Sequence, residues 1–119
     1  LPGAPEVSPD LAGWRRERLP ALPRDASITV VPDWVCEVLS ASTRRYDLRI
    51  KRPFYARAGV SHLWIVDTDA RLITASMLEN GRWSELGVWS DETEARIPPF
   101  DAVPLDIAAW WQGDPAEGA

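Results

Sequence analysis

The sequence WVCEVL at residues 34–39 ends the segment Ile28–Ser40, which carries the strongest strand signal of the chain. Side chains of a strand alternate between its two faces, so Glu37 shares a face with Val35 and Leu39. Glu37 therefore lies in mid-strand between apolar neighbours, where an unpaired carboxylate would be costly. The pattern predicts that a cation compensates this charge. The alternative is an edge strand that leaves Glu37 in water.

A helix is predicted to follow this strand. Ser42 or Thr43 can cap its start, and the helix runs to about Ala58, with Gly59 as its C-terminal stop. Pro53 lies inside the predicted helix, where it removes one backbone donor and should bend the helix axis.

Two charged residues fall on the face of this helix that turns inward. At 100° per residue, Asp47 and Lys51 lie with the apolar residues Ile50 and Phe54, whereas several arginines fall on the opposite face. Lys51 is also the only lysine of the chain beside twelve arginines. A compact ammonium can orient or activate a water, which the rigid fork of arginine does poorly. We interpret Asp47 and Lys51 as site residues; the alternative is a pair at the margin of the apolar stripe that reaches solvent.

The other predicted elements are strands, a hairpin and a short helix. They comprise a short strand near Val7, a buried strand at residues 63–66, a hairpin of residues 72–78 and 83–89 around Asn80-Gly81, and a helix at residues 105–111. The order strand, strand, helix, strand, hairpin, helix indicates an α/β or α+β domain around a mixed β-sheet. We expect one domain over residues 1–112 and a disordered tail at 113–119.

Charge is unevenly divided along the chain, whose net charge is −5. Residues 10–60 hold ten positive and six negative side chains, whereas residues 61–119 hold three positive and eleven negative ones. A basic half joined to an acidic half is compatible with nucleic acid approaching one side only. Two solvated surfaces with no partner explain the charges equally well.

Several classes of protein are disfavoured by the residue types present. No apolar run approaches the roughly 20 residues of a membrane-spanning helix, and no export signal is apparent, so we expect a cytoplasmic protein without membrane contact. The single cysteine, Cys36, excludes an internal disulfide framework and is interpreted as buried packing. His62 is the only histidine, so neither a histidine-based metal cluster nor a serine triad can be assembled.

Together these segments resemble a known family over residues 6 to 111. The segments are Pro9-Asp10-Leu11, the run from Pro32 to Thr43 that contains Glu37-Val38-Leu39-Ser40, the spacing Asp47-x-x-x-Lys51-x-x-x-Tyr55-x-x-x-Gly59-Val60, and Leu63-Trp64-Ile65-Val66-Asp67. The chain resembles the Uma-two family of restriction endonucleases.

This resemblance implies a restriction-endonuclease-like PD-(D/E)XK fold and a Mg²⁺- or Mn²⁺-dependent hydrolysis of phosphodiester bonds in DNA. The two acidic metal ligands of the family fall on Asp10 and Glu37. Its commonest arrangement has a lysine two residues after the glutamate, but here that residue is Leu39. The family supplies the lysine from the following helix, at Lys51.

The resemblance also assigns supporting roles. Lys51 would orient the attacking water, and Asp47 and Tyr55 would support the site from the same helix face. The expected phosphate contacts are Arg15, Arg16, Arg44 and Arg45.

One departure from the family leaves an alternative open. Members carry several dozen residues before the Pro-Asp pair, including a helix and strands, whereas this chain has eight. A domain short at its N-terminus would leave part of the sheet exposed, which a homodimer could cover. The alternative function is therefore an inactive nuclease fold that works as a binding or assembly module.

Overall fold

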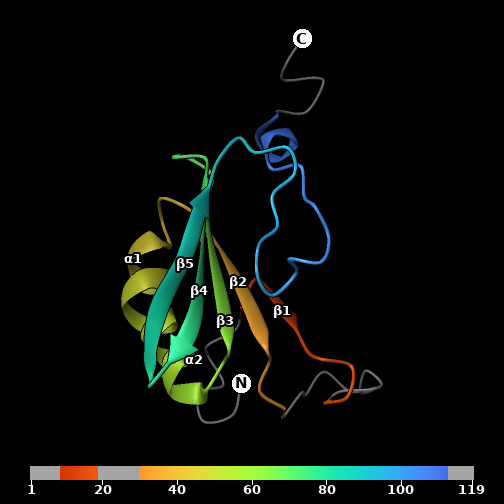
Figure 1. Ribbon diagram of the computed structural model, residues 1–119. Coiled ribbons are helices and arrows are strands. Elements are labelled where there is room, and N and C mark those ends of the chain that lie inside the picture. The colour runs from red at the N-terminus through yellow and green to blue at the C-terminus, as the bar shows by residue number, and fades with distance from the viewer. Residues whose placement is uncertain (1–8, 19–29, 113–119) are drawn as a thin grey trace, which may run out of the picture.

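The computed structural model describes residues 9–18 and 30–112, and in this part the chain forms one five-stranded sheet with the order β1-β2-β3-β4-β5 (Figure 1). The strands are β1 (Leu11–Gly13), β2 (Trp34–Leu39), β3 (His62–Asp67), β4 (Leu72–Glu79) and β5 (Arg82–Trp89). β2 and β3 are parallel and the other neighbours are antiparallel. The predicted mixed-sheet α+β class is therefore confirmed.

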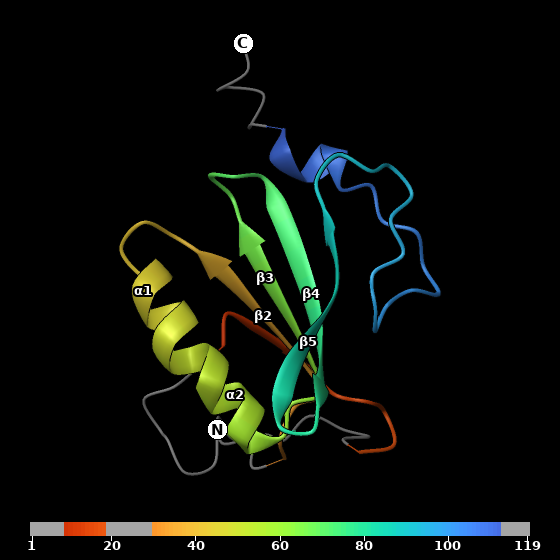
Figure 2. The ribbon, with the colours of Figure 1, turned by 60° about the vertical axis from the view of Figure 1, so that its left-hand side comes forward.

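One helical stretch forms the crossover between the parallel strands β2 and β3, which a short turn could not connect. It consists of α1 (Arg44–Tyr46), the π-helical turn η1 (Asp47–Lys51) and α2 (Arg52–Ala58). The stretch lies against one face of the sheet (Figure 2). Gly59 ends it with a φ of 86°, a left-handed conformation that glycine adopts without steric cost, as predicted.

Before the proline, the helical stretch widens into a π turn instead of continuing as a regular α-helix. The Arg52 N–H donates to the Asp47 carbonyl, five residues back. Pro53 follows directly, and in a regular α-helix its ring would meet the carbonyl of Arg49. One expectation was wrong here: Ile50, placed inward at 100° per residue, is 50% exposed. A constant angle per residue does not hold through a π turn.

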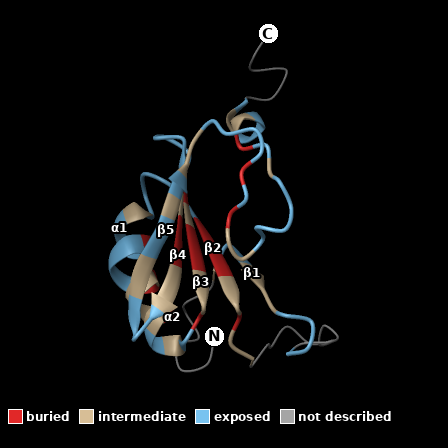
Figure 3. Cartoon of the chain, viewed as in Figure 1, coloured by how far each residue is buried: buried red, intermediate tan, exposed pale blue. Residues whose placement is uncertain are grey.

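The other face of the sheet is covered by an irregular segment, residues 90–107, which we call the C-terminal strap (Figure 1). Ala95 pairs with Leu105 in an isolated bridge, and the Trp64 indole N–H donates to the Pro98 carbonyl at 2.8 Å. Figure 3 shows buried positions both in the middle of the sheet and along this strap. The strap continues into the 3-10 helix η2 (Ala108–Trp111), within the predicted C-terminal helix.

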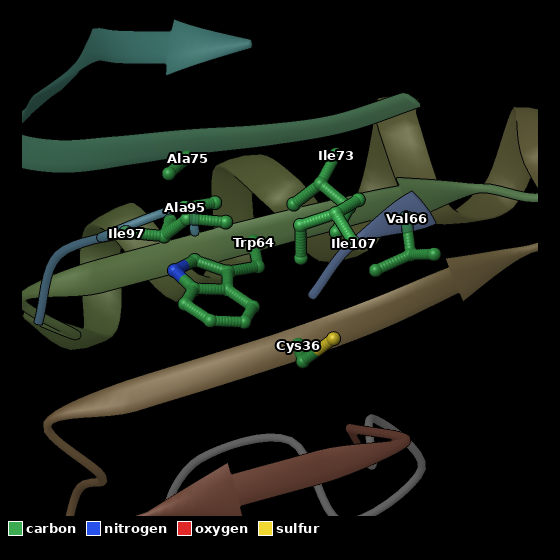
Figure 4. Close-up of a cluster of buried hydrophobic side chains, with 8 residues drawn as sticks. All are labelled: Cys36, Trp64, Val66, Ile73, Ala75, Ala95, Ile97 and Ile107. Atoms are coloured by element: carbon green, nitrogen blue, oxygen red, sulfur yellow. The ribbon is translucent and has the colours of Figure 1, made fainter. Parts of the chain in front are cut away.

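The core beneath the strap joins sheet and strap residues in one apolar cluster (Figure 4). Its buried members are Cys36, Trp64, Val66, Ile73, Ala75, Ala95, Ile97 and Ile107. Cys36 is thus packed on the face opposite to Glu37, as predicted. Because burial excludes water from both faces of the central strands, a charged side chain there needs a partner within the protein.

The predicted hairpin is confirmed. Asn80 and Gly81 have φ values of 51° and 77°, which suit the tight turn between β4 and β5. The strand expected near Val7 and the tail at 113–119 lie outside the described residues, so the extent of the domain over residues 1–112 stays a prediction.

The buried thiol of Cys36 is expected to make stability fall at alkaline pH. Burial raises its pKa to about 12, with the charges of Glu37 and Asp10 adding to the effect. Above pH 9 the unfolded chain loses this proton while the folded chain keeps it. The free energy of unfolding should therefore drop by about 1.4 kcal/mol per pH unit. Urea unfolding between pH 8 and 10 measures this slope, and Cys36→Ala should flatten it; equal slopes would contradict the prediction.

Candidate active site

A buried carboxylate, that of Glu37, is the centre of the candidate site. Glu37 lies in β2 on the sheet face that the helical stretch covers, and it is 1% exposed. Lys51 donates from Nζ to Oε2 at 2.9 Å, and the Tyr55 hydroxyl donates to Oε1. Both oxygens of the carboxylate are therefore engaged. The sequence pattern predicted a cation beside Glu37, and in the structure this cation is the Lys51 ammonium.

The helical stretch supplies three of the site residues from one face. Asp47, Lys51 and Tyr55 follow one another at intervals of four residues, and all three are buried. Lys51 Nζ also lies 3.5 Å from Asp47 Oδ1, so the ammonium stands between two carboxylates. The alternative that this acid–base pair reaches solvent is wrong.

Asp10 brings a further carboxylate to the same place from the first strand. β1 pairs antiparallel with β2 so that Leu11 faces Cys36, which puts the preceding residue, Asp10, opposite Glu37. Its Oδ2 accepts a hydrogen bond from the Val38 N–H at 2.8 Å. Asp10 is exposed, unlike Glu37. The pair therefore combines a buried carboxylate with a solvent-facing one.

The electrostatics of the site follow from burial and close partners. Burial raises the pKa of Glu37, and the nearby Asp10 adds to this, while the hydrogen bonds from Tyr55 and Lys51 oppose it. Burial lowers the pKa of Lys51, but its hydrogen bond to Glu37 and the charges of the neighbouring carboxylates outweigh this and raise it. Burial and Glu37 also raise the pKa of Tyr55. At neutral pH both donors to Glu37 therefore keep their protons.

The donor chemistry of these residues fits a hard divalent cation. Asp10, directly before β1, and Glu37 in the adjacent β2 offer carboxylate oxygens, the ligand type that Mg²⁺ prefers. In the described part of the chain no group of three or more histidine, cysteine, aspartate or glutamate side chains is gathered closely enough to hold a metal. Mg²⁺ commonly keeps several waters and binds proteins through one or two carboxylates, so two ligands suffice for it.

The four arginines that are expected to contact phosphates form two pairs, which lie near opposite ends of β2. Arg15 and Arg16 are exposed in the segment after β1, where the Arg15 backbone N–H donates to Asp33, just before β2. Arg44 and Arg45 follow β2 at the start of the helical stretch.

These two helix arginines differ in their partners. Arg44 forms an ion pair with Asp67 at the end of β3, at 2.9 Å. Arg45 is exposed, and none of the described acidic groups pairs with it. Arg45 is therefore the better placed of the two for a phosphate.

Sequence reasoning missed a pocket of about 220 Å³ at the starts of β2 and β3. Residues that line it include Trp14, Arg15, Asp33, Trp34, His62 and Phe100. His62, the only histidine of the sequence, is the first residue of β3. Trp34 lies on the face of β2 opposite to Glu37, so the pocket is separate from the carboxylate site. Its wall comes from four segments far apart in the sequence, and no local motif joins them.

Comparisons with known proteins agree with this fold. The sheet and crossover helix resemble the crystal structure of a protein from Anabaena variabilis described as a putative nuclease, with a TM-score of 0.62 and 20% sequence identity. The similarity covers 89% of this chain and 62% of that protein, so this chain spans less than two thirds of that protein's length.

The sequence model of the Uma2 family, described as "Putative restriction endonuclease", matches residues 1–109. The chain belongs to this family, as its motifs predicted. The comparison with curated proteins found no match. None of the helices in the described ranges is long and apolar enough to cross a membrane.

Proposed function

We propose that this protein is an endonuclease that hydrolyses phosphodiester bonds in DNA with the help of Mg²⁺ or Mn²⁺. The observation that carries the proposal is the buried Glu37 carboxylate, flanked by Asp10, which directly precedes the neighbouring strand, and by the single lysine of the chain. The desolvation cost of a buried ion pair is often not recovered in stability, which favours a functional role for this pair.

Each residue of the site has a separate proposed role. Asp10 and Glu37 would hold the divalent ion, which supplies Lewis acidity and offsets negative charge at phosphorus. Lys51 would orient the attacking water and stabilise the developing charge on the phosphate. Asp47 and Tyr55 position Lys51 and Glu37, because each contacts one of them directly.

Cleavage of plasmid DNA in the presence of Mg²⁺ or Mn²⁺ tests this function. Activity should appear with either ion, disappear with a chelator and be lost in Asp10→Asn. Asp10 is exposed, so this variant should fold normally. The matched control is Asp69→Asn, an exposed aspartate in the turn after β3, which should cleave like the wild type. Cleavage that persists in Asp10→Asn would refute the assignment.

Contacts to phosphates should make DNA binding depend steeply on salt. The logarithm of the affinity falls linearly with that of the salt concentration, with a slope set by the number of phosphates neutralised. Arg45→Ala should reduce this slope by about 1 and weaken all DNA sequences alike. Arg82→Ala, an exposed arginine of the hairpin, is the control and should leave the slope unchanged. Binding that ignores salt would contradict the prediction.

A second candidate function is a nuclease fold that binds DNA or assembles with a partner without cutting. The engagement of both Glu37 oxygens by protein donors favours this candidate. It predicts salt-dependent DNA binding with no metal-dependent cleavage. The homodimer and the cytoplasmic location expected from the sequence also stay predictions; sedimentation at several protein concentrations tests the first.

A further inference from the structure

The Lys51 ammonium lies between two carboxylates but holds them unequally. It is 2.9 Å from Glu37 Oε2, a normal hydrogen bond, and 3.5 Å from Asp47 Oδ1, beyond the usual range of about 2.7–3.2 Å. Asp47 is one helical turn before Lys51 on the same buried face. A small movement of the lysine side chain would therefore transfer its closest contact from one carboxylate to the other.

Glu37 needs a cation next to it at all times. It is almost fully removed from solvent, and an unpaired charge there would be strongly unfavourable. Tyr55 contributes a hydrogen bond but no charge. When no metal is bound, Lys51 is the cation that meets this need.

The charges of the site match one divalent ion. Asp10, Glu37 and Asp47 contribute three negative charges against the single positive charge of Lys51. The remaining two negative charges equal the charge of Mg²⁺ or Mn²⁺. A divalent ion and the ammonium would repel each other if both contacted Glu37, so metal binding would favour movement of the ammonium away from this carboxylate.

We propose that the Lys51 ammonium compensates the charge of Glu37 while the site holds no metal. When a divalent metal binds, the ammonium moves from Glu37 to Asp47. This inference rests on the proposed metal-dependent function. In it, Asp47 is a positioning residue that receives the displaced ammonium. Within the described ranges, Lys51 is the only cationic group paired with Asp47, so this carboxylate is available to receive it.

A double-mutant cycle on Mg²⁺ affinity, measured by calorimetry without DNA, tests the exchange. Lys51→Met keeps the length of the side chain and removes the competing charge, so it should bind Mg²⁺ about tenfold more tightly than the wild type. Asp47→Asn leaves the displaced ammonium without a carboxylate and should bind about tenfold more weakly. In the Lys51→Met background, Asp47→Asn should change the affinity by no more than about twofold, because there is no ammonium to receive.

The single lysine also gives a direct readout of the movement. Protein labelled with ¹⁵N and ¹³C only in lysine has one side-chain signal, that of Lys51. This signal should shift as Mg²⁺ is added, with the same midpoint as the calorimetric curve. The Mg²⁺-induced shift should be smaller in Asp47→Asn, where the acceptor is missing. Far-ultraviolet circular dichroism confirms that each variant is folded, and Lys51→Gln replaces Lys51→Met if the latter is not.

The outcomes separate this inference from the proposed function. If Mg²⁺ binds neither the wild type nor Lys51→Met, the metal-dependent function itself fails. If Mg²⁺ binds and Glu37→Gln abolishes the binding, but Asp47→Asn has the same effect with and without Lys51, the metal site stands and the exchange is overturned. An Asp47 effect that depends on Lys51, together with the lysine shift, supports the exchange.

Discussion

Replacing Lys51 by alanine is expected to lower the rate of DNA cleavage by about 10²–10³-fold, the usual effect of removing one group that stabilises a transition state. Metal binding should persist, because an ammonium is not a metal ligand. Rates are compared per folded molecule, since the variant also loses a buried ion pair. Cleavage at the wild-type rate in Lys51→Ala would eliminate the proposed role.

The same activity should return in part when a lysine is placed two residues after the glutamate. Leu39 is buried on the same face as Glu37, so Leu39→Lys added to Lys51→Ala puts an ammonium near the same carboxylate. Recovery is partial because burying a lysine where Leu39 packed has a desolvation cost. The matched control is Val38→Lys, whose side chain points away from the site and is 41% exposed. If the folded Leu39→Lys, Lys51→Ala variant cleaves no faster than this control, the hypothesis that Lys51 replaces the lysine two residues after the glutamate is unsupported.

Lys51→Met is expected to cost about 3–5 kcal/mol of stability at neutral pH, because it leaves the buried charge of Glu37 without a cation. Adding Glu37→Gln should restore much of the loss, since the amide carries no charge to compensate. Urea unfolding of the wild type, both single variants and the double variant measures this coupling. Additive effects of the two substitutions would show that the pair does not interact.

The stability of Lys51→Met should also depend on pH in a predictable direction. Burial already raises the pKa of Glu37, and removing Lys51 raises it further, with Asp10 and Asp47 nearby. The folded variant then binds a proton that the unfolded chain releases, so stability increases as pH falls through the raised pKa. The gain is complete below the ordinary pKa of a glutamate, 4.5. Glu37→Gln removes the added slope; a slope that survives this substitution has another origin.

The candidate site could be predicted largely from violations of local patterns. A glutamate between apolar neighbours required a cation, and a lysine among inward-facing residues could provide one; the structure brings Glu37 and Lys51 into contact. Strand alternation and a four-residue helical interval are short-range regularities, so a sequence displays them directly. The exposed position of Ile50 could not be predicted in this way, because the π turn before Pro53 breaks the regular interval.

The covering of the second sheet face was not predictable from periodicity. The C-terminal strap buries Ala95, Ile97 and Ile107 although it has almost no regular secondary structure. Irregular segments have no repeat that a hydrophobic pattern could reveal, and their contacts are with residues distant in sequence. The pocket at the starts of β2 and β3 was missed for the same reason.

The shortness of β1 has a consequence for the affinity of the proposed metal site. β1 has three residues, and Asp10 precedes it at the margin of the sheet, whereas Glu37 lies in a strand with neighbours on both sides. Short strands at the edge of a sheet can open locally, and this opening costs only a small fraction of the free energy of global unfolding. Only molecules with β1 docked present both carboxylates, so the apparent affinity of the proposed site for a metal would be its intrinsic affinity scaled by the docked fraction. Substitutions that alter the docking of Leu11–Gly13 would therefore change the occupancy of the proposed metal site without replacing Asp10 or Glu37.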